Sequence, residues 1–264
     1  MGIRFGHISD THLIGSQKSE VMLKLEKAGG DPLAALTLAL QELSSEKPDF
    51  LIITGDMCHE GTAEEYAELR ELLDRYLPGV PVITSMGNHD VRDAFRKGFL
   101  GDNYGGDHPY CDTLEIGGMR IISIDTAWEK QLLGSVGDDQ LDWLEEVLKA
   151  PVRAGNILIC HHPVCPELSS FGMEMSPRFE RIIRGGNFIA IFNGHVHRSC
   201  TGYAAGVLHI TCQALAFDIE VMGNTCYYTT RGGYNFCAVD NEGEFFIDSR
   251  IVTPKGTIFH QKKF

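Results

Sequence analysis

The sequence predicts an α/β protein in which short buried strands alternate with helices, followed by a region of antiparallel sheet. Several short apolar runs rich in β-branched residues are separated by segments with helical periodicity. The runs show little alternation of polar and apolar residues, which is typical of strands covered on both faces. Toward the C-terminus, Gly and Asn turns separate further strands at short intervals, which favours antiparallel pairing.

The predicted helices have recognisable starts. Asp31 and Pro32 supply an N-cap and a first-turn proline for one helix. Thr62 and Glu65 form a capping-box pattern for the next, and a third is expected to begin near Asp138. The buried strands are expected at Arg4–Ser9, Phe50–Thr54, Val80–Ser85, Asn156–Cys160 and Phe188–Phe192. The helical residues expected to face the core are Leu33, Leu36, Leu40 and Leu43, then Tyr66, Leu69, Leu72 and Tyr76, then Leu141, Leu144, Val147 and Leu148.

The antiparallel regions run from Tyr110 to Asp125 and from Gly206 to Phe259, where turn residues recur between apolar stretches. No internal repeat, low-complexity tract or linker divides the sequence. We therefore predict a single domain that spans residues 1–264.

The composition is that of an ordinary globular protein with a strong acidic excess. Hydrophobic residues make up 43% of the chain, charged residues 22%, and the formal net charge is −13. This charge argues against nucleic-acid polymers and membranes as partners, because anionic surfaces are bound through basic faces. No signal-peptide pattern and no run of eighteen apolar residues is found, so a cytoplasmic location is expected. The eight cysteines lack a CxxC pair and are expected to be reduced thiols packed as small apolar residues.

Polar clusters follow all five predicted buried strands. Ligands of open α/β sheets gather at the carboxyl ends of the strands, so these clusters are expected to converge on one crevice. Each cluster alone is a weak signal, since an Asp-x-His or Gly-Asp after a strand is more often a plain turn. In chain order the clusters are Asp10 and His12; Asp56; Asn88, His89 and Asp90; His161 and His162; His195 and His197.

Seven residues of these clusters are suitable ligands for divalent first-row metals. Seven ligands are too many for one tetrahedral zinc and about right for two metals that share a carboxylate. The glycines just before Asp56, Asn88 and His195 suggest tight turns in which the backbone can approach a metal or phosphate. The seven candidate ligands are Asp10, His12, Asp56, Asn88, His161, His195 and His197.

The ordered pattern D-x-H, G-D, G-N-H-D, H-H-P and G-H-x-H resembles the calcineurin-like metallophosphoesterases, from Ile8 to about Arg198. The neighbouring text "SDTHL", "GNHDVRDAF" and "DDQLDWLEEVL" is closer to the branch that contains class III cyclic-nucleotide phosphodiesterases and glycerophosphodiesterases. The resemblance implies a four-layer αββα fold with two mixed β-sheets flanked by helices, and a dinuclear Fe, Mn or Zn centre. The C-terminal strands, at about 206–264, are expected to complete the second sheet.

The resemblance also assigns roles to the polar clusters. Asp10, His12 and His197 would bind the first metal, Asn88, His161 and His195 the second, and Asp56 would bridge them. The two metals, roughly 3.5–4 Å apart, would share a water and lower its pKa, which provides a hydroxide to attack phosphorus. His89 would protonate or stabilise the leaving oxygen, and Asp90 could orient it. The expected catalytic residues are therefore His89 and Asp90.

Some assignments have alternatives. Asn88, His89, Arg92 and His162 are expected to contact substrate, although His89 could be a structural histidine and Arg92 an exposed residue at a helix start. His162 could instead orient His161 or be purely structural. One position departs from the family pattern: three residues after Asp56, where many relatives carry Asp or Asn, this chain has His59. Either Asp90 alone supports His89, or His59 gives the pocket a different pH behaviour.

The predicted function is hydrolysis of a small phosphodiester, either a cyclic nucleotide or a glycerophosphodiester. A phosphomonoesterase or pyrophosphohydrolase on the same site is the alternative, and a metal-bearing scaffold protein without turnover is a third reading. Phe217 and Tyr234 could stack on a base or cover a glycerol, but aromatics in antiparallel sheet are more often core residues. The apolar C-terminal strands would allow a homodimer.

Overall fold

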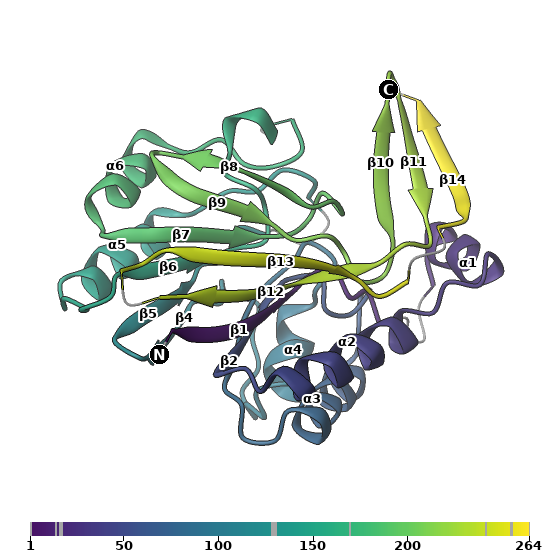
Figure 1. Ribbon diagram of the computed structural model, residues 1–264, viewed down its shortest axis with the longest axis horizontal. Helices are drawn as coiled ribbons and strands as arrows, with labels where there is room; N and C mark the ends of the chain where they lie inside the picture. The colour runs from purple at the N-terminus through teal and green to yellow at the C-terminus, as the bar shows by residue number, and fades with distance from the viewer. Residues whose placement is uncertain are drawn as a thin grey trace.

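Two mixed β-sheets pack face to face, with helices on their outer faces (Figure 1). The computed structural model describes residues 2–13, 15, 18–127, 131–168, 170–240, 242–253 and 256–263. The first sheet has the strand order β13-β12-β1-β2-β3 and the second β4-β5-β6-β7-β9-β8. The first sheet contains β1 (Ile3–Ile8), β2 (Phe50–Thr54), β3 (Val82–Ser85), β12 (Gly233–Val239) and β13 (Phe245–Ile251). The second contains β4 (Asp112–Ile116), β5 (Met119–Ser123), β6 (Asn156–Ile159), β7 (Phe188–Asn193), β8 (Cys200–Ala204) and β9 (Val207–Thr211).

Helices α2 to α6 form the two outer layers, whereas α1 packs against the strands of a third, smaller sheet. One hydrophobic cluster joins α2, α3 and α4 to the first sheet, and another joins α5 and α6 to the second. The four-layer arrangement of two mixed sheets flanked by helices is therefore confirmed. The helices are α1 (Glu20–Lys27), α2 (Pro32–Glu46), α3 (Ala63–Tyr76), α4 (Arg92–Gly98), α5 (Asp138–Leu148) and α6 (Pro177–Gly185), with a 3₁₀ turn at Pro166–Leu168.

The central strands are apolar on both faces because both faces are covered. In β2, Phe50 and Ile52 point into the core between the two sheets, whereas Leu51 and Ile53 point toward α2 and α3. β6 alternates in the same way between the inter-sheet core and the helices α5 and α6. This explains the continuous apolar runs in the sequence.

The predicted helix starts are confirmed. Asp31 caps α2 by accepting a hydrogen bond from the backbone N–H of Ala34 at 3.0 Å, and Thr62 with Glu65 forms the capping box of α3. The prediction that Leu33 faces the core is wrong, since its side chain is 54% exposed. The buried stripe of α2 is centred near Leu36 and Leu43, and Leu33 lies about 90° around the helix from that centre.

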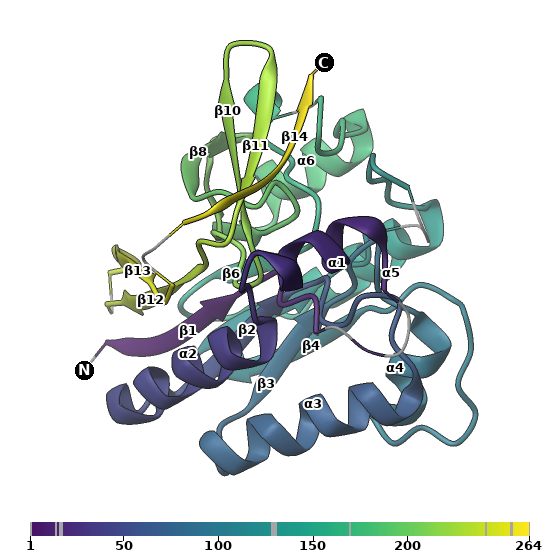
Figure 2. The same cartoon turned by 90° about the vertical axis from the view of Figure 1, so that its right-hand side faces the viewer.

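The C-terminal strands do not simply complete the second sheet. Only β9 joins it, while β12 and β13 extend the first sheet by antiparallel pairing with β1. β10 (Asp218–Met222), β11 (Thr225–Thr229) and β14 (Ile258–Lys263) form a third sheet, which projects from the body beside α1 (Figures 1 and 2). The correction has a physical reason: alternation of side chains identifies a strand but does not say which edge it pairs with.

The parallel strands bring five loops to one end of the molecule. β1, β2 and β3 are parallel in the first sheet, and β6 and β7 are parallel in the second. The loops that follow them carry all the polar clusters singled out in the sequence. Within the described ranges, no helix is long and apolar enough to cross a bilayer.

Candidate metal centre

The structure brings the seven predicted ligands together as two adjoining groups of donor atoms. The first group consists of Asp10, His12, Asp56 and His197, all buried, with ligand atoms within 4.8 Å of one another. His12 Nε2 lies 3.2 Å from His197 Nε2 and 3.5 Å from Asp56 Oδ2. His197 Nε2 lies 3.4 Å from Asp10 Oδ1. Carboxylate and imidazole atoms that face one another in this way form a donor set suited to a first-row divalent cation.

The second group is centred on His161. Its Nε2 atom lies 3.1 Å from Asn88 Oδ1, 3.1 Å from His195 Nδ1 and 3.4 Å from Asp56 Oδ2. The same Asp56 oxygen therefore faces His12 in one group and His161 in the other. The two histidines of "GHVH" divide between the groups, with His195 in the second and His197 in the first.

Backbone carbonyls fix which ring nitrogen of each histidine faces the centre. His161 Nδ1 lies 2.8 Å from the carbonyl oxygen of Thr54, and His197 Nδ1 lies 2.9 Å from that of Phe217. His195 is turned the other way, with Nε2 3.0 Å from the carbonyl oxygen of Leu132. A carbonyl can only accept, so each of these nitrogens carries a proton, and in the neutral ring the opposite nitrogen offers a lone pair to the donor group.

The backbone at the ligands is strained. Asp10, His12, Asp56, His195 and His197 all have positive φ values, between 39° and 72°. Residues with a Cβ rarely adopt this left-handed conformation, which costs on the order of 1–3 kcal/mol each. The surrounding fold imposes this strained backbone conformation. The conformation directs the five side chains toward the candidate metal centre.

Two glycines permit close approach to the carboxylates. A Cβ at Gly87 would collide with Oδ1 and the backbone nitrogen of Asp56, and one at Gly194 would collide with Oδ2 of Asp10. The Asp10 carboxylate also accepts hydrogen bonds from Ser9 Oγ at 2.6 Å and from the backbone N–H of His195 at 3.0 Å. The glycines before Asn88 and His195 therefore leave space for the carboxylates of Asp56 and Asp10.

Electrostatics favour ionised carboxylates in the site. Burial raises the pKa of Asp56, yet the charges of His161, His89 and His12 hold it well below its usual value. For His161, burial lowers the pKa, but the Asp56 carboxylate outweighs burial and raises it to about 9. In the metal-free protein, a proton on His161 thus partly replaces the positive charge that this acidic pocket requires.

His89 lies at the edge of the first group. Its side chain is only half-buried, and its ring centroid lies 5.2 Å from that of His12 and 4.6 Å from that of His59. The backbone N–H of His89 donates to Asp56 Oδ1 at 2.8 Å. Its buried Nδ1 atom has no hydrogen-bond partner among the described residues.

Asp90 does not support His89. Its carboxylate accepts hydrogen bonds from the hydroxyl of Tyr66 at 2.7 Å and from the backbone N–H groups of Gly87, Met57 and Cys58 at 2.8–3.3 Å. The chain turns at this point, so neighbours in sequence point in different directions. The expectation that Asp90 orients His89 is therefore replaced by a structural role, in which Asp90 ties the loop after β3 to the loop after β2.

Two residues expected to contact substrate are occupied elsewhere. Arg92 is 6% exposed and forms a two-pronged ion pair with Asp125, at 2.7 and 3.0 Å. His162 is fully buried, with Nδ1 3.1 Å from Thr126 Oγ1 and its ring packed against that of His195. The ion pair occupies the guanidinium of Arg92, so the alternative that Arg92 is an exposed residue is wrong as well. The contacts of His162 favour its structural alternative over direct binding of substrate. The contact of Asn88 and His89 with substrate stays a prediction.

Of the two aromatics considered for substrate binding, only Phe217 belongs to the site. Its buried ring centroid lies 4.2 Å from that of His197 and 5.6 Å from that of His12. Tyr234 is a core residue whose hydroxyl donates to Glu42 at 2.7 Å.

Ser9 was missed by the sequence reasoning, although its position next to Asp10 could have suggested it. The carbonyl acceptors gave no signal, because every residue has one.

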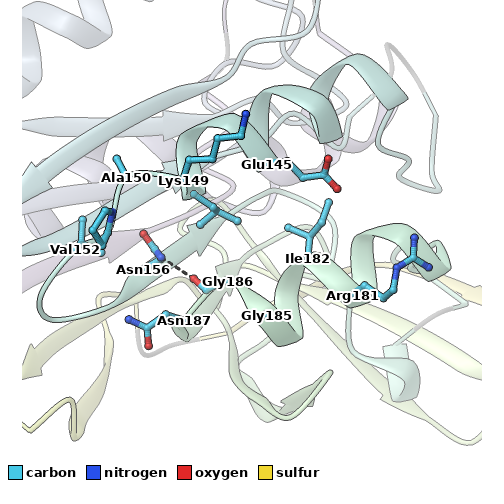
Figure 3. A pocket seen from close by; sticks show the side chains of 12 residues that line it. Glu145, Lys149, Ala150, Val152, Asn156, Arg181, Ile182, Gly185, Gly186 and Asn187 are labelled. Atoms are coloured by element: carbon cyan, nitrogen blue, oxygen red, sulfur yellow. Dashed lines mark hydrogen bonds between the residues drawn. The ribbon is translucent and has the colours of Figure 1, made fainter.

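A separate hollow of about 470 Å³ lies between the C-terminal ends of α5 and α6 (Figure 3). Asn156, the first residue of β6, lines it and donates to the carbonyl oxygen of Gly186 at 2.6 Å. Because His161 follows the other end of β6, the hollow lies at the opposite end of the strand from the metal ligands. It is not part of the candidate metal centre.

The donor set suits metal ions better than a hydrogen-bonded network. His12 and His197 bring their Nε2 atoms within 3.2 Å of each other, and a neutral His197 with its proton on Nδ1 directs the lone pair of Nε2 at His12. The neutral rings of His161 and His195 would likewise direct lone pairs at each other, and without metal the raised pKa of His161 places a proton between them. Lone pairs directed at one another are satisfied by cations.

Comparison with known proteins identifies the family. The model of the calcineurin-like phosphoesterases matches residues 3–199. The chain belongs to the calcineurin-like phosphoesterase family. It is therefore a metal-dependent phosphoester hydrolase, and the resemblance inferred from the sequence motifs is confirmed.

This phosphoesterase has curated relatives at moderate identity. It is 32% identical over 227 residues to a probable cyclic nucleotide phosphodiesterase of Rhodococcus erythropolis, covering 82% of this chain and 73% of the relative. It is 33% identical over 227 residues to a cAMP/cGMP dual specificity phosphodiesterase of Mycobacterium tuberculosis, covering 84% and 67%. A probable glycerophosphodiester phosphodiesterase of Arcobacter nitrofigilis is 27% identical over 223 residues, covering 81% and 79%.

Solved structures confirm the fold of this phosphoesterase. A purple acid phosphatase from yellow lupin seeds superposes with a TM-score of 0.61 at 15% identity, covering 99% of this chain and 53% of the other. TT1561 of Thermus thermophilus superposes with a TM-score of 0.59 at 11% identity, covering 96% and 100%. At these identities the likeness concerns the fold alone.

Proposed function

We propose that this phosphoesterase is a dinuclear-metal phosphodiesterase that hydrolyses small phosphodiesters, with cyclic nucleotides as the favoured substrates. The observation that carries the dinuclear centre is the position of Asp56 Oδ2, 3.5 Å from His12 Nε2 and 3.4 Å from His161 Nε2. One carboxylate oxygen that faces two donor groups is suited to bridging two cations. A single cation would leave one of the groups unsatisfied.

Each donor group would hold one metal. Asp10, His12 and His197 would bind the first, Asn88, His161 and His195 the second, and Asp56 both. When bound, the two metals supply positive charge that activates a water molecule for attack and stabilises the charge that develops on the phosphoryl oxygens.

The residues of the chain hold this centre in one geometry and handle the proton of the leaving group. The Thr54, Phe217 and Leu132 carbonyls hold three histidines with their lone pairs turned inward. His89 is the residue best placed to protonate the leaving oxygen, since it is half-buried and adjoins His12. A positioned acid of this kind contributes about 10²–10⁴-fold to the rate.

A small diester is favoured over larger or more highly charged substrates. A relative at 32% identity is named a probable cyclic nucleotide phosphodiesterase and one at 33% a cAMP/cGMP dual specificity phosphodiesterase, whereas one at 27% is named a probable glycerophosphodiester phosphodiesterase. The net charge of −13 disfavours nucleic-acid polymers and polyphosphates, which require extended basic surfaces. The cytoplasmic location and the homodimer stay predictions, and this function requires neither.

A substrate panel with metal analysis tests the proposal. The purified protein is assayed with cAMP, cGMP, glycerophosphocholine, glycerophosphoethanolamine, bis-p-nitrophenyl phosphate and p-nitrophenyl phosphate, and its Fe, Mn and Zn contents are measured. We expect diesters to be preferred over the monoester, with cyclic nucleotides the best substrates. Preference for the monoester would favour the phosphomonoesterase alternative, and a fully metallated protein without turnover on any ester would indicate a scaffold.

A further inference from the structure

We infer that His59 is a positioning residue that holds both His12, a ligand of the proposed first metal, and His89, the proposed acid. The inference rests on the proposed metal centre and deepens it. His59 stands three residues after Asp56, and the structure places its side chain against both histidines.

His59 lies against both histidines. Its Nδ1 atom is 3.3 Å from Nδ1 of His12, and its ring stacks on that of His89 with centroids 4.6 Å apart and planes 24° apart. His89 Nδ1 has no hydrogen-bond partner within the described part of the chain, so His59 does not hold His89 by a hydrogen bond. Its hydrogen-bonding nitrogen serves His12 instead.

The tautomers follow from this geometry. His12 Nε2 faces the carboxylate of Asp56 and Nε2 of His197, so it is the nitrogen that would bind the metal and carries no proton. The proton of a neutral His12 is then on Nδ1, which donates to Nδ1 of His59. His59 must accept through Nδ1 and therefore carries its own proton on Nε2. An imidazole thus takes the role for His12 that backbone carbonyls have for the other three histidines.

The backbone holds His59 in place relative to both partners. Its N–H donates to the carbonyl oxygen of Leu13 at 3.0 Å, one residue beyond His12. On its other side, the N–H of Glu60 donates to the carbonyl oxygen of His89 at 2.9 Å. His59 is only 6% exposed, so its ring has little freedom to move away.

The stacked ring gives His89 its orientation. The described residues offer no hydrogen-bond partner to the buried Nδ1 atom of His89. The orientation of the His89 ring is therefore set by packing against the rings of His59 and His12. An offset-stacked aromatic pair stabilises one ring orientation without fixing a proton. Ring packing, and not a hydrogen bond to a carboxylate, therefore orients the proposed acid His89.

Two substitutions separate the roles. His59→Asn places an amide oxygen where Nδ1 stands and keeps an acceptor for His12, but removes the stacked ring. His59→Phe keeps a ring beside His89 and removes the acceptor. We expect Mn²⁺ affinity, measured by chelator competition on the full-length protein, to fall about 10–100-fold in His59→Phe and to change less than about threefold in His59→Asn.

Kinetics report the second role. At saturating Mn²⁺ we expect kcat of His59→Asn on bis-p-nitrophenyl phosphate to fall about tenfold with KM unchanged. Wild-type Mn²⁺ affinity in His59→Phe would overturn the claim that His59 positions His12. Wild-type kcat in His59→Asn would overturn the claim that His59 orients His89. The affinity measurement needs no substrate, so an error in the proposed diester chemistry does not affect it. Wild-type protein that takes up no metal would overturn the metal centre and this inference with it.

A third measurement needs no variant and covers the case in which a substitution prevents folding. Nitrogen-15 spectra of histidine-labelled wild-type protein loaded with Zn²⁺ distinguish the two neutral tautomers of each ring. We expect His59 to carry its proton on Nε2 and His12 on Nδ1. A proton on Nδ1 of His59 would overturn the inference.

Discussion

The Nδ1 atom of His161 lies 2.8 Å from the carbonyl oxygen of Thr54, and this contact joins the ends of strands from different sheets. Thr54 is the last residue of β2 in the first sheet, whereas His161 follows β6 in the second. One sheet therefore fixes the tautomer of a ligand that the other sheet supplies. The metal centre depends on the packing of the two sheets as well as on the identity of its ligands.

Asp56→Asn tests the shared carboxylate. The substitution keeps the shape of the side chain but removes the charge that faces His12 and His161. We expect kcat to fall on the order of 10³-fold, because charge stabilisation worth several kcal/mol depends on the metals being held together. Metal content should fall as well. Asp93→Asn, on an exposed pair with Lys97, is the matched control and should behave as wild type. Full activity in Asp56→Asn would contradict the proposal.

His89→Ala separates catalysis from metal binding. His89 adjoins the first donor group without joining it, so we expect the metal content to stay at the wild-type level. Loss of the acid should reduce kcat about 10²–10⁴-fold. Elemental analysis and steady-state kinetics measure the two effects, with the exposed His108→Ala as control. Loss of metal from His89→Ala would instead make His89 a ligand.

Asp90→Ala tests the structural role assigned to Asp90. The change leaves the Tyr66 hydroxyl and the N–H groups of Gly87 and Met57 without their acceptor in a buried site. We expect the free energy of unfolding to fall by about 3 kcal/mol, measured by urea denaturation. Tyr66→Phe, which removes only one of these donors, should cost about 1 kcal/mol. A variant that loses activity but keeps wild-type stability would restore the catalytic role of Asp90.

Metal uptake should release protons. Burial lowers the pKa of His161, but Asp56 outweighs burial and raises it to about 9, so the metal-free protein is protonated there at pH 7.5. A metal ligand must be neutral, so affinity should rise about tenfold per pH unit between pH 7 and about 9 for each proton displaced. Calorimetry in buffers of different ionisation enthalpy counts these protons. Metal binding without proton release would contradict the raised pKa, and His161→Gln should release fewer protons than wild type.

The raised pKa of His161 makes metal affinity rise with pH, but it makes the stability of the metal-free protein fall with pH. Because the folded-state pKa of His161 lies above its ordinary value of 6.5, its stabilising contribution is complete below about pH 6.5. The contribution is lost as the pH rises through about 9. Thermal unfolding of the metal-free protein should therefore show falling stability over this range. Rising stability over the same range in the metal-free protein would contradict the sign.

The convergence of the seven candidate ligands could be predicted from the sequence because their residue types and their positions at strand ends both carry chemical information. Asp90 could not be assigned correctly, because adjacency to His89 suggests contact while the turn directs the carboxylate to Tyr66. The carbonyls of Thr54, Leu132 and Phe217 have no sequence signal at all. The third sheet was missed for a similar reason, since the pattern of a strand does not specify the strand that it pairs with.

Anomalous diffraction from crystals grown with Mn²⁺ tests the central claim most directly. We predict two anomalous peaks that share Asp56, one contacted by Asp10, His12 and His197 and the other by Asn88, His161 and His195. A single peak, or peaks away from these residues, would contradict the dinuclear centre.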